Sequence, residues 1–223
     1  MKSQKQQAAE ETLKLVKDGT KIGIGSGSTV NEFIVLLGEA VKDGLQIQAV
    51  TASQQSKRLA KQHGIPIIDF PEHEKLSIVI DGADEVELSS FQALKGGGGS
   101  LVREKLVAAA GETFVLMVDE HKIVQQLGHF TLPVEVIPFG WQKTAERIKQ
   151  LGGKPQMRKG EEGFFISDNH NYILDCDFGL IKDPNALHQS LKQLVGVVET
   201  GLFIDMVDGV YVAGGTGVRY IQR

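Results

Sequence analysis

The sequence predicts an α/β fold: a Rossmann-like parallel sheet domain with a second, smaller ferredoxin-like α+β domain. Strand-like and helix-like segments alternate from residue 4 to residue 120, which is typical of a parallel sheet covered by helices on both faces. Beyond "LPVEVIP" the order changes to β-α-β-β-α-β, as in a split βαβ unit. We therefore expect residues 1–130 and 204–223 to form the larger, catalytic domain and residues 131–203 the smaller one.

The larger domain is expected to begin with an amphipathic helix over residues 4–17, closed by "KDGT". "LSIVIDGADE" is a continuous apolar run that ends in acids, as in a strand buried on both faces. The other expected segments, in chain order, are the strand and Gly/Ser turn "KIGIGSGST", the helix "VNEFIVLLGEAVKDG", the strand "LQIQAVTAS", the helix "QQSKRLAKQHG", the strand "IPIIDF", the helix "LVREKLVAAAG" and the strand "TFVLMVDE".

The smaller domain is predicted from shorter segments between residues 132 and 203. Its expected elements are strand 132–137, helix 141–151, short strands near 155–158 and 163–167, the turn "SDNHN", the strand "YILDCDF", helix 184–194 and strand 196–203. The last segment, "DGVYVAGGTGVRYI", is expected to be a strand plus a tail that is able to rejoin the first sheet.

Composition excludes several classes of protein. Of 223 residues, 41% are hydrophobic and 23% charged, which is ordinary for a globular protein, and a net charge of −4 argues against a broad nucleic-acid surface. The one cysteine, Cys176, excludes an internal disulfide and fits a reducing compartment. No apolar run has the length of a membrane span or the form of a signal peptide. We therefore expect a cytoplasmic protein without nucleic-acid or membrane partners.

The first candidate site is "GIGSGST", Gly23 to Thr29, which runs from a strand into a helix. Glycines let a ligand approach the backbone, and the start of a helix offers N–H groups and partial positive charge to an anion. The third glycine of the dinucleotide fingerprint falls on Ser28, and no Gly-Lys-Ser/Thr of a Walker A loop follows. A phosphate-binding loop and a tight turn with Ser/Thr capping both stay open.

The second candidate site, "DGADE", places Asp81 and Asp84 directly after a buried strand. Both carboxylates can reach one rim of the sheet, although Asp and Gly are also ordinary turn residues. The third, "KGGGGSLVREK", joins four glycines to a helix that carries Glu104. Bare glycine N–H groups, with Lys95 at the mouth, can line an oxyanion or phosphate pocket. In the fourth, "VDEHK", Lys122 follows a strand and is either solvated or a phosphate contact.

Other chemistries have little support in this chain. The six histidines form no H-x-H or H-E-x-x-H spacing, and no G-x-S-x-G elbow occurs. Cys176 alternates with Leu174 and Phe178 on one strand face, so we expect it in the core.

Three segments in this order, "GSGST", "DGADE" and "KGGGGSLVREK", resemble the motifs of ribose-5-phosphate isomerase type A. "LPVEVIPFG" and "GVVETGLF" resemble further segments of that family, so the similarity spans nearly the whole chain. The resemblance implies an α/β domain with a smaller ferredoxin-like domain. It also implies interconversion of ribose 5-phosphate and ribulose 5-phosphate without a metal or organic cofactor, by a homodimer or homotetramer.

The resemblance also implies roles for individual residues. Glu104 would be the base that moves a proton between C1 and C2, and Asp81 and Asp84 would bind sugar hydroxyls, with Asp81 assisting ring opening. Lys95 and the glycine N–H groups would stabilise the enediolate. The residues implied to bind substrate or its phosphate are Ser26, Gly27, Ser28, Thr29, Gly96, Gly97, Gly98, Lys122 and Lys5.

Two departures from the family pattern are visible, Ser26 where Thr is common and the tail "AGGTGVRYI". Two rivals remain open at this point. A non-catalytic sugar-phosphate sensor would keep the phosphate loop without needing Glu104 or Asp81. A CoA transferase or amino-sugar-phosphate deaminase on a related sheet would use a glutamate nucleophile or a histidine.

Overall fold

The computed structural model describes residues 2–223, which divide into two compact units. The larger unit contains the chain up to Ala83, Arg103–Ile123 and Met206–Arg223. The smaller unit contains Asp84–Val102 and Val124–Asp205. The chain therefore passes from one unit to the other at four points, two of which lie within the predicted site segments.

The larger unit is built on a six-stranded sheet in the order β14-β13-β6-β3-β1-β2. Neighbouring strands from β13 to β2 are parallel, and only β14 is antiparallel to its neighbour. The strands are β1 (Thr20–Ile24), β2 (Ile47–Thr51), β3 (Ile78–Asp81), β6 (Phe114–Asp119), β13 (Gly209–Gly214) and β14 (Gly217–Gln222). All four residues of β3 are buried, as its apolar run predicts.

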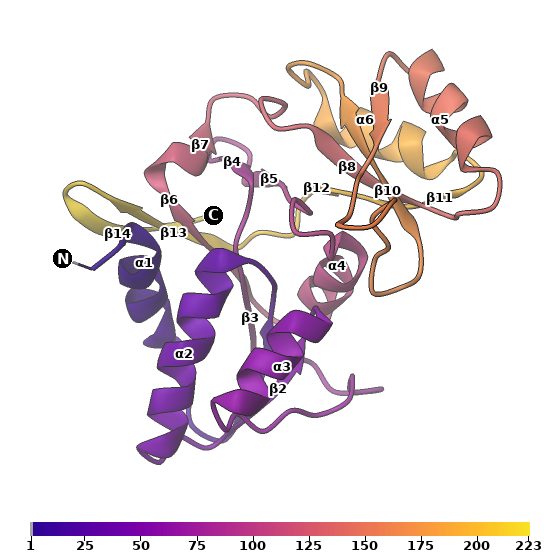
Figure 1. Ribbon diagram of the computed structural model, residues 1–223. Helices are drawn as coiled ribbons and strands as arrows, with labels where there is room; N and C mark the ends of the chain where they lie inside the picture. Colours follow the sequence, from indigo (N-terminus) through magenta and orange to yellow (C-terminus); the bar gives the residue numbers. More distant parts are fainter. Residues whose placement is uncertain (1) are drawn as a thin grey trace. The chain divides into compact units, whose positions relative to one another are not determined.

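Helices cover both faces of this sheet. The bounds are α1 (Gln4–Leu13), α2 (Ser28–Lys42), α3 (Gln54–Gln62) and α4 (Leu101–Ala109), whose first two residues belong to the smaller unit. Helices α1 and α2 contact each other, and Figure 1 shows them side by side. Their apolar residues share one core with Ile22 and Ile24 of β1. Gly23 alternates with those two and so faces the other side, where Val107 of α4 packs against it.

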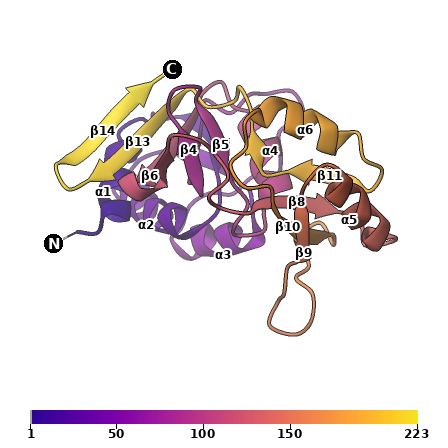
Figure 2. The same cartoon turned by 90° about the horizontal axis from the view of Figure 1, so that it is seen from above.

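The smaller unit has a four-stranded sheet in the order β11-β8-β10-β9, with antiparallel neighbours. Its elements are β8 (Leu132–Val136), α5 (Trp141–Gln150), β9 (Lys154–Met157), β10 (Tyr172–Asp177), α6 (Pro184–Lys192) and β11 (Val197–Thr200). Leu132, Val134 and Val136 of β8 share a core with Ile148 of α5 and Leu191 of α6. Figure 2 shows the long loop between β9 and β10 extending from the sheet. Chain order and sheet order together confirm the predicted α/β fold with a smaller antiparallel domain.

A third sheet, in the order β12-β5-β4-β7, is absent from the sequence-based prediction. It contains β4 (Glu85–Glu87), β5 (Gln92–Leu94), β7 (Ile123–Val124), which follows the 3₁₀ helix η1 (Glu120–Lys122), and β12 (Leu202–Phe203). Pairing of β5 with β12 attaches residues 84–102 to the smaller unit. The smaller unit therefore also contains residues 84–102 and 124–130, which the prediction assigned to the larger domain.

Three expected elements are wrong in detail. "IPIIDF" forms one isolated bridge, from Ile67 to Ala49, because the sheet ends at β2. Residues 163–167 also form only isolated bridges, since they lie in the loop between β9 and β10. The C-terminal segment is a β13–β14 hairpin rather than a strand and a tail, and β13 rejoins the first sheet beside β6. In the described part of the chain, no helix combines the length and apolarity needed to cross a membrane.

Candidate active site

The loop Gly25–Thr29 joins β1 to α2 in the larger unit. Gly27 precedes the helix with φ +114°, a backbone conformation that L side chains rarely adopt, and it has no side chain to cap the helix. Gly27 therefore accepts no hydrogen bond from the N–H groups in the first turn of α2 through a side chain. These N–H groups make the start of α2 favourable for an anion. Lys5 of α1 adds a cation there, because its Nζ donates to Ser28 Oγ at 2.8 Å.

Asp81 connects this loop to the second motif. It ends β3, the neighbour of β1, and its Oδ1 accepts from the N–H of Ser26 at 3.0 Å and of Gly82 at 2.7 Å. A Cβ on Gly25 would lie 1.9 Å from Asp81 Cγ. Gly25 is therefore required for the buried carboxylate to lie against the loop backbone. The structure thus brings together the motifs "GSGST" and "DGADE".

Thr29 and Lys122 occupy different positions in the larger unit. Thr29 lies in the first turn of α2, and its Cβ is 3.9 Å from where a Cβ of Gly82 would be. Lys122 ends η1, just after β6, and is half-buried.

Glu104 lies on the buried side of α4. Its residue is 4% exposed, and Val107 and Ala108 on the same helix are also buried. Val107 lies against Gly23, where a Cβ would approach its Cγ1 to 2.6 Å, so the glycine permits close packing of α4 on β1. A carboxylate in the first helical turn is also favoured by the helix dipole.

The glycine run belongs to the smaller unit, together with Asp84. The N–H of Gly97 donates to Asp84 Oδ2 at 2.8 Å, so two of the predicted segments also meet there. Gly96 and Gly99 have φ +101° and +86°, and the N–H of Gly99 donates to the carbonyl of Gly96 at 3.0 Å. The run is a tight turn that only glycine adopts without strain.

The sequence suggested that Lys95 lies at the mouth of a pocket, but in the structure Lys95 is buried. It is 2% exposed, its N–H donates to the carbonyl of Gly201 at 2.8 Å, and its Nζ lies 5.3 Å from the centre of the Phe203 ring. The pairing of β5 with β12 positions it, because Lys95 directly follows β5 and Phe203 ends β12. A cation over an aromatic ring is an attractive arrangement away from water.

A protein-family model described as ribose 5-phosphate isomerase A (phosphoriboisomerase A) matches residues 48–217. The ribose-5-phosphate isomerase A of Shouchella clausii is 56% identical over 219 residues, covering 98% of this chain and 96% of that protein. The chain belongs to the ribose 5-phosphate isomerase A family. It is an isomerase of that family.

Solved structures of the family have the same fold. Ribose 5-phosphate isomerase A from Methanocaldococcus jannaschii superposes with a TM-score of 0.94 at 39% identity, covering 99% of this chain and 98% of that one. A D-ribose-5-phosphate isomerase in complex with phospho-erythronic acid gives a TM-score of 0.95 at 38% identity, with the same coverage. The likeness therefore extends over both units.

One contact of the glycine run was not predicted from the family motifs. Arg158, in the loop after β9, donates to the carbonyls of Gly96 and Gly97 at 2.9 and 3.1 Å. No local pattern marks this arginine, because its partners are 62 and 61 residues away in the chain. Only the folding of the smaller unit brings them together.

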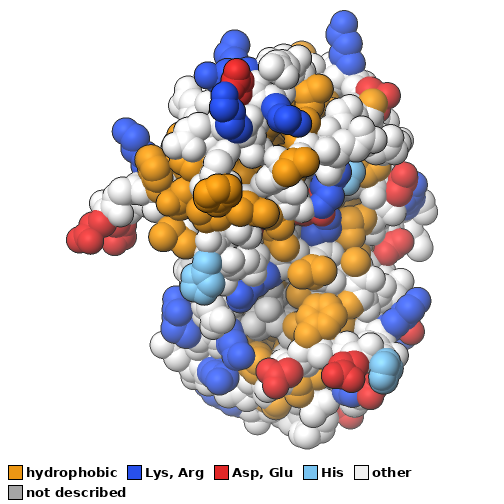
Figure 3. All heavy atoms as spheres, turned by 90° about the vertical axis from the view of Figure 1, so that its right-hand side faces the viewer, with side chains coloured by type: hydrophobic (Ala, Val, Ile, Leu, Met, Phe, Trp, Pro, Cys, Tyr) orange, Lys and Arg blue, Asp and Glu red, His pale blue; other side chains and the backbone are white. Residues whose placement is uncertain are grey.

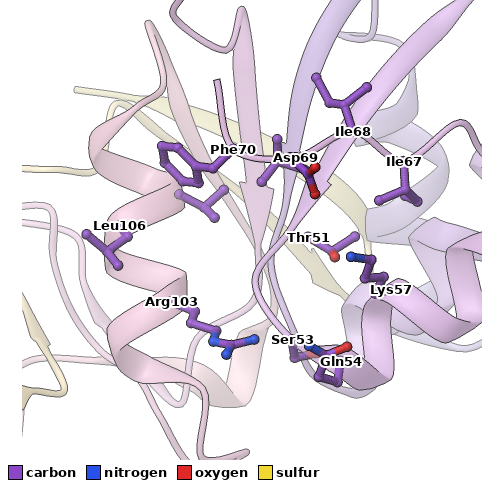
Figure 4. Close-up of a pocket in the computed structure, with 12 residues that line it drawn as sticks. Thr51, Ser53, Gln54, Lys57, Ile67, Ile68, Asp69, Phe70, Arg103 and Leu106 are labelled. Atoms are coloured by element: carbon purple, nitrogen blue, oxygen red, sulfur yellow. The ribbon is translucent and has the colours of Figure 1, made fainter. Parts of the chain in front are cut away.

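A hollow of about 230 Å³ lies elsewhere in the larger unit, between α3, α4 and the segment 67–70. Figure 4 shows Arg103 of α4 pointing across it towards Ser53 and Gln54, with Lys57 on the far side. None of the predicted site residues lines it. It is therefore separate from the loop that holds Asp81.

Two further observations concern residues outside the site. Within residues 2–223, no group of three His, Cys, Asp or Glu side chains has the geometry of a metal site. Cys176 is buried in the core of the smaller unit, as its strand alternation predicts, and burial raises the pKa of its thiol.

Proposed function

We propose that the protein interconverts D-ribose 5-phosphate and D-ribulose 5-phosphate, a step of the pentose phosphate pathway, through an enediolate with Glu104 as general base. The observation that carries this proposal is a buried carboxylate in the first turn of α4, a few residues after a glycine turn in the chain. Membership of the isomerase family supports the substrate.

The proposed chemistry conserves atoms and electrons within one sugar. Glu104 removes the C2 proton of the open-chain aldose, and the electron pair moves through C1–C2 to the C1 oxygen. Glu104 then returns the proton to C1, while the O2 proton is lost and a proton is gained at O1, which leaves a ketone at C2. Glycine N–H groups and Lys95 stabilise the negative oxygen of the intermediate.

The carboxylates Asp81 and Asp84 are assigned to the sugar. Asp81 assists ring opening and binds a hydroxyl, and its link to the N–H of Ser26 supports a place beside the loop Gly25–Thr29. Asp84 binds a second hydroxyl, and its link to Gly97 supports a place beside the glycine run. Each carboxylate is oriented by backbone N–H groups, from Ser26 and Gly82 for Asp81 and from Gly97 for Asp84.

The phosphate is assigned to the start of α2. The residues proposed to bind it are Ser26, Gly27, Ser28, Thr29, Lys5 and Lys122. The bond from Lys5 to Ser28 supports this assignment, because it places an ammonium group at a helix start whose N–H groups already favour an anion.

The decisive experiment follows formation of a ketose from ribose 5-phosphate by the purified protein, with and without exhaustive EDTA treatment. We expect activity in both samples, since no cofactor is assigned a step. Glu104→Gln should lower kcat by roughly two to four orders of magnitude with little change in KM, the usual worth of a positioned base. Near wild-type kcat in Glu104→Gln, or activity lost with EDTA and restored by Mg²⁺, would overturn the mechanism.

We also propose a cytoplasmic homodimer or homotetramer. A single buried cysteine suits a reducing compartment. Large hydrophobic side chains of the smaller unit are exposed, among them Phe139 at 94% and Val195 at 81%. Figure 3 shows hydrophobic side chains gathered on one face, and such patches commonly mark protein contacts. Light scattering should give a mass two or four times the 24.3 kDa of the chain; the mass of one chain contradicts assembly.

A further inference from the structure

Arg158 is held rigidly at the base of the loop between β9 and β10. Its Nε donates to Asp175 Oδ2 at 3.0 Å and its Nη2 donates to the other oxygen of the same carboxylate. The Arg158 side chain is only 12% exposed. A two-pronged contact of this kind fixes the plane of the guanidinium as well as its position.

The remaining nitrogen of this guanidinium contacts the glycine run. Nη1 donates to the carbonyl oxygens of both Gly96 and Gly97. One cation thus draws two consecutive carbonyls to the same side of the backbone. Gly96, with φ +101°, has the conformation that makes such a turn possible without strain.

The direction of the carbonyls determines the direction of the amides. In a trans peptide group the C=O and the next N–H point in opposite directions, and no peptide bond between described residues is cis. The carbonyl of Gly96 faces Arg158, and the N–H of Gly97, in the same peptide group, faces Asp84. Because the carbonyl of Gly97 also faces Arg158, the N–H of Gly98 must point away from it, to the side of Asp84.

The loop that carries Arg158 is itself anchored at two further points. The Phe165 ring packs so closely on Gly99 that a Cβ at Gly99 would lie 2.3 Å from Cζ of the ring. The Arg158 guanidinium carbon lies 5.7 Å from the centre of the same ring. Towards β10, the buried Glu135 accepts from three side chains of the loop through Oε1. These donors are Ser167 Oγ at 3.0 Å, Asn169 Nδ2 at 3.1 Å and Asn171 Nδ2 at 2.9 Å.

We propose that Arg158 is a positioning residue that orients the peptide groups of the glycine run, so that the N–H of Gly97 holds Asp84 and the N–H of Gly98 is aimed at the negatively charged oxygen formed during isomerisation. This rests on the proposed function, and it names the group that orients the proposed oxyanion donors. Successive N–H groups on one side of the backbone bind anions; here the first binds the Asp84 carboxylate and the second is assigned to the substrate oxygen. Arg158 acts from behind this site, on the carbonyl side, and does not itself touch the substrate.

Arg158→Lys tests the proposal, because lysine keeps the charge but cannot bind two carbonyls and a carboxylate at once. We expect kcat to fall about 10- to 100-fold and KM for ribose 5-phosphate to change less than threefold, since the donors act on charge that develops in the transition state. Arg147→Lys on the exposed surface of α5 is the matched control and should leave both constants unchanged. A kcat within twofold of wild type in Arg158→Lys overturns the proposal.

Ligand binding provides a readout that loss of stability alone would not give. Phospho-erythronic acid, the ligand of one solved relative, has a carboxylate near the position of the reacting carbon, whereas inorganic phosphate tests the anion site alone. Calorimetry should show about tenfold weaker binding of phospho-erythronic acid to Arg158→Lys, with phosphate affinity unchanged. Equal weakening of both ligands contradicts a role limited to the glycine amides.

If Arg158→Lys folds poorly, the double variant Arg158→Met/Asp175→Leu removes both charges and leaves no lone buried ion, and it should show the same loss of kcat. The ¹⁵N–¹H resonances of Gly97 and Gly98 should shift in either variant, and unchanged resonances overturn the proposal. If the wild-type protein has no isomerase activity, the proposed function is wrong. The resonances of Gly97 and Gly98 would still show whether Arg158 orients these amides.

Discussion

The two glycine-rich loops of this protein, Gly25–Thr29 in the larger unit and Gly96–Gly99 in the smaller one, are held in different ways. The first is held by the elements on either side of it, with β1 before it and α2 after it. Its distant partners include Asp81 on the neighbouring strand, Ser56 of α3, which donates to the carbonyl of Gly25, and Lys5 of α1, which donates to Ser28. The second runs from β5 towards α4, and it is also held by side chains from Asp84 and Arg158 on opposite sides.

This difference shows two separate uses of glycine. Gly25 removes a side chain so that a buried carboxylate can lie against the backbone, and Gly27 lets the chain turn into α2. In the second loop, glycine lets consecutive peptide groups point the same way while other residues choose that direction. Both loops run from a strand into a helix, but in the second a distant side chain, Arg158, fixes the direction of the carbonyls.

The comparison predicts its largest effect at Gly25. In Gly25→Ala the new Cβ would overlap the Asp81 carboxyl group, which is buried and bound by two N–H groups and cannot move aside without losing them. We expect kcat/KM to fall by at least about 100-fold, and the free energy of unfolding to fall by about 1–3 kcal/mol. Steady-state kinetics and urea unfolding measure both.

Gly215→Ala is the matched control for this substitution. A Cβ at Gly215 would meet no atom within 4 Å, and its φ lies outside the left-handed range. Activity and stability should stay at the wild-type level. A Gly25→Ala protein as active as this control would show that Asp81 does not need its present position.

An intermediate effect is expected for the phosphate contacts around the first loop. Lys122→Ala and Thr29→Ala should each raise KM for ribose 5-phosphate, by about tenfold for the charged Lys122 and less for Thr29, with kcat changed less than threefold. Removing a contact made equally in the ground and transition states affects binding alone. If both variants bind inorganic phosphate and substrate as tightly as the parent, the anion site lies elsewhere.

The smallest effect is expected at Gly97, in the second loop. A Cβ there would lie 2.7 Å from Asp84 Oδ1, but Asp84 is half-buried and its carboxylate can rotate away. Gly97→Ala should therefore lower kcat only about three- to tenfold and leave the urea midpoint nearly unchanged. A loss larger than that of Gly25→Ala would reverse the comparison, and would mean that the second loop is the more tightly packed of the two.

Much of the fold was predictable from the sequence because its signals are local. Apolar runs such as "LSIVI" and "FVLMV" mark strands that are buried along their length, and helical periodicity marks α2 and α3, which precede both in the chain. The predicted order of the smaller domain holds for the same reason. The hairpin β4–β5 was missed because its strands have three residues each and little pattern of their own.

The site was predictable in part. Asp81, Asp84, Lys95 and Glu104 were singled out from acids after a strand, glycines before a helix and the resemblance of these motifs to the family, and their catalytic roles stay predictions. Their surroundings were not predictable. Lys95 was expected at a pocket mouth, and it is buried because β5 pairs with β12, more than a hundred residues later in the chain.

What the sequence by itself determined is the succession of strands, helices and glycine turns, together with the family that these motifs indicate. Such features depend on neighbours within a few residues, where propensity and periodicity act. What only the tertiary structure decided is which side chains hold each turn: Asp81 against Gly25, and Arg158 behind Gly96 and Gly97. Hydrogen bonds across more than fifty residues depend on strand register and packing, and no local pattern encodes those.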